Sequence, residues 1–344
     1  MRMNIGKGLR KRIFSKVTLL LIVMITLLLV GCNSANVSLS DKKHLKAVFE
    51  RQNKIYYYDE KKQEIKELGE SGTLKELLSV SPNNEKIVYQ IKTDDTSNKQ
   101  PEIVVENLRN GKIEKLPINN EEFKIITDIK WINDERILIK SHINPSVLAY
   151  GVYDVNTKKE VNFVKGNSLN TYNDGDKLLY TKEVKDTEGT KSYIYINDKL
   201  VYELENADEQ IQETVLSEDF SKLAFKTFKF DITTGEVTDT IYLADFDKEY
   251  KLSNIKSTTV PQVIVGSLML DKNQLYLSNH DVTYKVENDL FTETDLKKPE
   301  LNTEKPKEEQ LAKFKEILAK QFPKEFVADY LELEELQIYN IKFF

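Results

Sequence analysis

The pattern of apolar and polar residues divides the chain into three parts. An apolar run, Val17 to Val30, stands near the N-terminus. From Leu45 to about Leu296, short runs rich in Ile, Val, Tyr, Phe and Leu alternate with clusters of Asn, Asp, Gly, Ser and Lys, without helical periodicity. Short apolar runs bounded by turn-forming residues are the signal of strands and hairpins. The central part is therefore predicted to be an all-β body, followed by a tail of different character.

One element recurs along this body. It consists of a short strand, a polar turn, and a basic or polar residue that opens a second, hydrophobic strand, and a strand–turn–strand element follows each copy. Four strands in roughly 40 to 50 residues are the size of one propeller blade. The sequence therefore predicts a six-bladed β-propeller over residues 45–298, with five or seven blades as alternatives. The residues that open the second strand, here called marker residues, are Lys46, Lys86, Arg136, Lys177, Lys222 and Gln274.

One copy of the repeat resembles a known family. Ser81 to Tyr89, SPNNEKIVY, resembles the S-P-D-G-K-x-I-A-Y hairpin of TolB-like β-propellers, which are WD40-like in architecture. The other copies lack the Ser-Pro pair, and the chain has only 12 glycines. Asn and Asp tolerate the left-handed backbone, so we expect them to form the turns in place of glycine.

The tail, residues 299–344, has its own pattern. Lys297 to Lys307 is rich in Lys, Pro and Glu and predicts a linker. An amphipathic helix is expected around 307–322, and the final run, 336–344, is strand-like. Because the first blade lacks its first strand, we expect this C-terminal strand to supply it and to close the ring. The apolar residues at helical spacing are Leu311, Phe314, Ile317, Leu318 and Phe322.

The N-terminus predicts export. The 14 residues from Val17 to Val30, apolar except for two threonines, follow a basic stretch. As a helix they would span about 21 Å, short of the ~30 Å hydrocarbon core, so residues 1–31 suit a signal peptide better than a permanent span. Leu29-Val30-Gly31-Cys32 resembles the bacterial lipobox. The resemblance implies diacylglycerol attachment to Cys32, with acyl chains such as palmitate, and cleavage between Gly31 and Cys32.

The alternative is an ordinary signal peptide with an accidental cysteine, but Cys32 is the only cysteine in 344 residues. Residues 32–44 are polar and small and predict a flexible tether that reaches roughly 20 Å. The expected location is the extracytoplasmic face of the cell membrane, through a lipid anchor. The Lys-, Asn- and Ile-rich composition favours a Gram-positive source.

The net charge of the body and the motifs that the sequence lacks argue against several classes of function. The first 31 residues hold six of the 50 basic residues and no acidic one, which leaves 44 basic against 56 acidic residues, a net charge of −12. A body this acidic, with three arginines, argues against nucleic-acid binding. No G-x-S-x-G, P-loop, H-E-x-x-H or EF-hand loop is present, so no cofactor and no metal is predicted. The acidic turn Asn173 to Asp176 could hold calcium, but such turns are more often turn formers.

The predicted binding surface is one rim of the propeller. In each blade the loop between the second and third strands lies on the same rim as the inter-blade connections, and these loops carry the irregular polar segments. The predicted loops are 51–53, 93–101, 141–146, 184–191, 231–240 and 278–281. The expected binding residues are Asp94, Asp95, His142, Asn144, Asp186, Glu188 and His280.

These features favour a membrane-anchored, non-catalytic binding or assembly scaffold at the cell envelope, with an envelope protein as its partner. The alternative is a lyase or hydrolase of an envelope polymer that uses two carboxylates of the central funnel, one with a raised pKa. A transporter's solute-binding lipoprotein ranks last, because that class alternates strands with helices.

Overall fold

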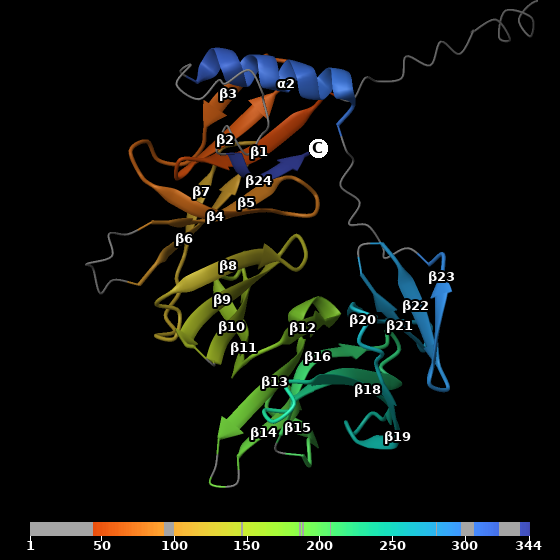
Figure 1. Cartoon of the computed structure of the whole chain (residues 1–344). Coiled ribbons are helices and arrows are strands. Elements are labelled where there is room, and N and C mark those ends of the chain that lie inside the picture. The colour runs from red at the N-terminus through yellow and green to blue at the C-terminus, as the bar shows by residue number, and fades with distance from the viewer. Residues whose placement is uncertain are drawn as a thin grey trace, which may run out of the picture. The chain divides into compact units, whose positions relative to one another are not determined.

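The computed structural model describes residues 44–92, 100–145, 147–185, 187, 189–206, 208–279, 281–296, 306–322 and 338–344. Within these residues the chain forms six four-stranded antiparallel sheets and one α-helix, α2 (Glu308–Gln321) (Figure 1). Each sheet is one propeller blade. The six-bladed β-propeller with a C-terminal helix and a closing strand, as predicted from the sequence, is confirmed.

The strands of each blade follow one another from the first to the fourth position. Blades 1 to 3 are β24 (Ile338–Phe343), β1 (Lys46–Arg51), β2 (Lys54–Asp59) and β3 (Glu64–Glu67); β4 (Lys75–Val80), β5 (Lys86–Ile91), β6 (Glu102–Asn107) and β7 (Ile113–Leu116); β8 (Ile126–Trp131), β9 (Arg136–Asn144), β10 (Val147–Asp154) and β11 (Lys159–Gly166). Blades 4 to 6 are β12 (Leu169–Tyr172), β13 (Lys177–Lys185), β14 (Thr190–Ile196) and β15 (Lys199–Glu203); β16 (Glu209–Leu216), β17 (Lys222–Phe230), β18 (Val237–Phe246) and β19 (Leu252–Thr259); β20 (Ser267–Asp271), β21 (Gln274–Ser278), β22 (Thr283–Glu287) and β23 (Leu290–Thr294).

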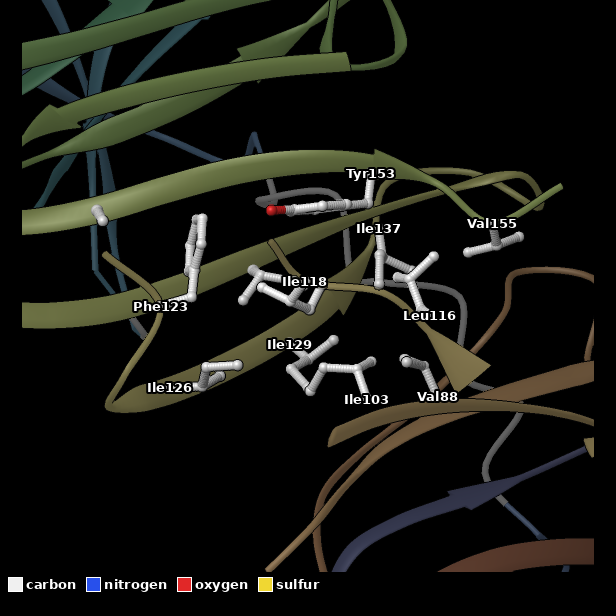
Figure 2. Packing of buried hydrophobic residues seen from close by; sticks show 12 residues of the cluster. Val88, Ile103, Leu116, Ile118, Phe123, Ile126, Ile129, Ile137, Tyr153 and Val155 are labelled. Atoms are coloured by element: carbon white, nitrogen blue, oxygen red, sulfur yellow. The ribbon is translucent and has the colours of Figure 1, made fainter. Parts of the chain in front are cut away.

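The hydrophobic core lies between consecutive blades. Because side chains alternate between the two faces of a strand, each central strand can pack against a neighbour on both sides. Between blades 2 and 3, for example, Val88 and Ile103 pack with Ile129 and Ile137 (Figure 2). Corresponding clusters join blades 1 and 2, 3 and 4, 4 and 5, and 5 and 6. Each blade thus positions the next.

The first blade is completed by the C-terminus. Strand β24 pairs antiparallel with β1, Ala47 opposite Phe343 and Arg51 opposite Ile338, and takes the first-strand position. This confirms the part of the prediction in which the C-terminal run supplies the missing first strand of blade 1. Helix α2 then covers the face of blade 1 that points away from blade 2, where Phe314 and Leu318 are fully buried against Phe49 and Tyr58.

The predicted N-terminal signal and lipidation site, Gly31 and Cys32 included, lies outside the described residues. No helix in the described part of the chain is long and apolar enough to cross a membrane.

Candidate functional site

The connections of each blade alternate between two rims, because its four strands run antiparallel. The turns from first to second and from third to fourth strand form one rim, which we call the turn rim. The loops from second to third strand, with the inter-blade connections, form the other, which we call the loop rim. The second-to-third loops are 52–53, 92–101, 145–146, 186–189, 231–236 and 279–282.

On the turn rim, side chains of one blade contact the turn of the next blade. The marker residue Arg136 of blade 3 donates from Nη1 to the Asp174 carbonyl oxygen at 2.9 Å and to Asp176 Oδ1 at 2.5 Å, both in blade 4. Likewise, Lys86 of blade 2 donates from Nζ to the Asp134 carbonyl oxygen in blade 3, at 3.2 Å. The ammonium of Lys177 in blade 4 lies 4.2 Å from the ring centroid of Phe220 in blade 5. In blades 2, 3 and 4 the marker residue therefore contacts the next blade on the turn rim, whereas Lys222 pairs with Asp245 of its own blade.

The candidate calcium turn belongs to this network. Asn173–Gly175 form a short 3₁₀ turn, and Asp176 just after it pairs with Arg136. Among the described residues, no group of three or more His, Cys, Asp and Glu side chains lies close enough to hold a metal ion.

On the loop rim, the structure places two of the seven predicted binding residues. The prediction that His142 lies in a loop is wrong, because the ladder between β9 and β10 continues further than its polar sequence indicates. His142 is half-buried within β9 and pairs with Leu148, while Asn144 ends the strand and is exposed. Asp94, Asp95, Asp186, Glu188 and His280 lie outside the described residues.

A pocket of about 370 Å³ lies between blades 3 and 4. Two of its lining residues, Asn167 and Ser168, form the connection from β11 to β12, so the pocket extends to the loop rim. Its volume is at the lower end of the range for small-molecule sites. Blade 3 contributes the face that points towards blade 4, through Asp128, Lys130, Leu138, Lys140, Leu148 and Tyr150, and blade 4 contributes Leu169.

Of the three charged side chains that line the pocket, two form an ion pair with each other and the third does not. Lys130 and Asp128, both on β8, form an ion pair at 2.8 Å. Burial raises the pKa of Tyr150 to about 12, so the phenol stays protonated and its O–H donates to the Asn167 carbonyl oxygen. Lys140 is half-buried and forms no ion pair with any described residue. Sequence reasoning missed this pocket, because charged residues at strand positions 128, 130 and 140 do not by themselves indicate a cavity.

Outside the pocket, burial raises the pKa of three glutamates, Glu50, Glu106 and Glu183, of which Glu50 and Glu106 accept hydrogen bonds within the fold. Burial raises the pKa of Glu50, and the nearby charge of Glu76 raises it further. Both Glu50 oxygens accept hydrogen bonds, Oε1 from the Leu78 backbone N–H and Oε2 from Asn340 Nδ2. Glu50 thereby connects β1 to β4 and to β24.

Comparison with protein families gives no match, and comparison with curated proteins gives none. Solved structures do match. One is the β-propeller domain of the Trilobed protease from Pyrococcus furiosus, with an open velcro topology, at TM-score 0.40 and 13% identity, over 71% of this chain and 78% of that chain.

Two further matches are TolB from Acinetobacter baumannii (TM-score 0.32, 15% identity, 72% of this chain and 61% of that chain) and dipeptidyl peptidase 4 from Porphyromonas gingivalis (0.46, 10%, 72% and 43%). The chain thus spans less than two thirds of the length of these two proteins. Its assignment to the β-propeller class rests on its own six four-stranded sheets.

Proposed function

We propose that the chain is a membrane-anchored extracytoplasmic lipoprotein whose propeller is a non-catalytic scaffold that binds an envelope protein. The observation that carries this proposal is the sequence Leu29 to Cys32, which places the only cysteine directly after an apolar run of signal-peptide length. Several acyl chains on one residue hold a protein on a bilayer stably, whereas one chain alone gives marginal binding.

The contrast between the two rims supports the binding role. The turn rim uses its side chains and carbonyl groups for contacts between blades, as the bonds of Arg136 and Lys86 show. The loop rim carries the longer and more varied connections, which a rigid set of blades holds in place. Binding residues concentrate on loops held in this way. The loop rim is therefore the proposed docking surface.

An envelope-polymer lyase or hydrolase would need a carboxyl group free to transfer a proton. Glu50 has the raised pKa that such an acid needs, but both of its oxygens are occupied by Leu78 and Asn340. This arrangement makes Glu50 a structural residue rather than a catalytic acid.

The anchor is tested with Cys32→Ala. Radiolabelled fatty acid is fed to cells that express either chain, and the labelled protein is followed through membrane fractionation. The variant is expected to remain an unprocessed precursor without label. Normal labelling of the variant would contradict the lipobox assignment.

The docking surface is tested by crosslinking and pull-down from intact membranes. A loop-rim variant carries Lys in place of Asp94, Asp95, Asp186 and Glu188. A control variant carries Lys at four exposed acidic positions of the turn rim, Glu64, Glu135, Asp198 and Glu218. Loss of a stoichiometric protein partner in the first variant alone is expected. Loss in the control alone, or recovery of polysaccharide in place of a protein, would overturn the proposal.

A further inference from the structure

The pocket between blades 3 and 4 contains a lysine whose counterpart elsewhere in the repeat is paired. Lys140 stands four residues after the marker Arg136, and Lys226 stands four residues after the marker Lys222. Both lie on the second strand of their blade, and both face an acidic residue of the first strand: Lys140 pairs in register with Asp128, and Lys226 with Glu213. The two sites therefore begin from the same arrangement.

In blade 5 the protein itself supplies the partners of the lysine. The Lys226 ammonium donates to the carbonyl oxygen of Gly266 at 3.0 Å and lies 3.8 Å from Glu213 Oε2. Gly266 is the residue immediately before β20, the first strand of the next blade. Only 15% of the Lys226 side chain is exposed. The charge is thus compensated by a carboxylate and by a backbone carbonyl group.

In blade 3 each of these partners is engaged elsewhere. Asp128 pairs with Lys130 on its own strand. Ser168 is the residue immediately before β12, and its carbonyl oxygen accepts the backbone N–H of Thr181 at 3.0 Å. What remains beside Lys140 is the 370 Å³ cavity. Lys140 thus lines the cavity without an ion pair to any described residue, and an anion that enters the cavity supplies its counter-charge.

We propose that this pocket binds a small organic monoanion, a carboxylate joined to an apolar portion, with Lys140 as its counter-charge. Two lysines and one aspartate give the lining a single net positive charge, which matches a monoanion better than a dianion. The side chains of Asn167 and Ser168 supply polar groups, and Leu138, Leu148 and Leu169 supply apolar surface for the rest of the ligand. This proposal is independent of the membrane anchor and of docking on the loop rim.

The test is isothermal titration calorimetry on the full chain in detergent. The probes are a series of straight-chain monocarboxylates and N-acetyl amino acids, each beside its neutral amide, and inorganic phosphate alone. We expect saturable binding of at least one carboxylate, about tenfold or more tighter than its amide, and weaker binding of phosphate. Absence of saturable binding across the series, or equal binding of acids and amides, would overturn the proposal.

Variants separate a binding role of Lys140 from a structural one. Lys140→Met should weaken carboxylate binding about tenfold or more and leave the thermal midpoint unchanged, and Lys140→Arg should retain binding. The matched control is Lys226→Met, which removes the paired lysine of blade 5. It should lower the thermal midpoint and leave carboxylate affinity unchanged. Wild-type affinity in Lys140→Met would refute the assignment.

Discussion

At the residue scale, asparagine and aspartate replace glycine in the tight turns. The left-handed backbone is adopted by Asn84 in blade 2, Asp174 in blade 4, Asn273 in blade 6 and Asn288 in the last hairpin. Asn and Asp, whose side chains are short, adopt a positive φ at lower cost than other residues with a side chain do. A chain poor in glycine can in this way form many hairpins, and some of the glycines that remain stand where a side chain would not fit.

Gly69 is such a position, and its replacement tests the packing between blades 1 and 2. Its φ is +75°, and an added Cβ would lie 2.6 Å from Lys75 Cε and from the Tyr89 hydroxyl. Lys75 and Tyr89 are both buried, so a shift of either side chain would disturb the packing around it. Gly69→Ala should therefore lower the free energy of unfolding by about 2–4 kcal/mol, from strain and overpacking together. Urea denaturation measures the loss.

Gly72→Ala is the matched control for this prediction. Gly72 also has a positive φ, +82°, but no atom lies within 4 Å of the position that an added Cβ would take. This variant should show only the backbone strain, about 1–2 kcal/mol. Equal losses in the two variants would show that the close approach of Lys75 and Tyr89 is unimportant.

The marker residues explain how much of the fold was predictable. In blades 2, 3 and 4 the basic residue at the start of the second strand reaches the next blade, as Arg136 does to Asp176, so these contacts leave a trace in the sequence. The pocket leaves no such trace. Whether Lys140 is paired depends on where Asp128 and the Ser168 carbonyl group point, which strand periodicity does not encode.

At the element scale, the outward-pointing faces of the first and last blades differ in polarity. The face of blade 1 that points away from blade 2 is apolar, with Ala47, Phe49 and Tyr58 buried, and α2 covers it. On blade 6, the face that points away from blade 5 is more polar: Ser278 bonds Thr283 across the ladder and Lys285 pairs with Glu287, beside Met269 and Tyr276. Helix α2 thus covers the more apolar of the two faces.

Phe314 of α2 tests this covering role. Its ring is fully buried and lies 4.9 Å from Tyr58, 5.7 Å from Phe49 and 5.5 Å from Phe343, between ring centroids. Phe314→Ala removes contacts to β1, β2 and β24 at once and should cost about 3–5 kcal/mol. Thermal unfolding measures the effect. The control is Glu316→Ala on the exposed face, expected to change stability by about 0.5 kcal/mol or less; similar effects of both would contradict the covering role.

Strand β24 is the second test at this scale. It fills the first-strand position of blade 1, and Lys46 exchanges backbone hydrogen bonds with Phe344 at 2.9 Å. Deletion of 336–344 leaves the edge of β1 unpaired and exposes Phe49 and Tyr58 on one side. We expect loss of cooperative unfolding, seen by circular dichroism during heating. Unchanged thermal stability would show that blade 1 holds together without its C-terminal strand.

At the scale of the whole molecule, tyrosines occupy one interface after another. Tyr57 packs between blades 1 and 2, Tyr58 beneath α2, Tyr150 and Tyr180 between blades 3 and 4, and Tyr242 between blades 4 and 5. Burial raises the pKa of each of these five phenols to about 12. Since tyrosine is the titratable group at each of these surfaces, all of them should weaken in the same alkaline range.

This sensitivity predicts alkaline unfolding. A phenol with a pKa of about 12 in the folded chain and about 10 in the unfolded chain stabilises the fold fully below pH 10. The stabilisation declines as pH rises from 10 towards 12, because the unfolded chain loses its protons first. We expect one cooperative transition in this window, with the rise in phenolate absorbance and the loss of β-sheet circular dichroism occurring together. The urea-unfolded chain, as a control, should titrate near pH 10 without a transition. Phenolate formation near pH 10 with the sheet signal unchanged would show that the buried phenols do not hold the blades together.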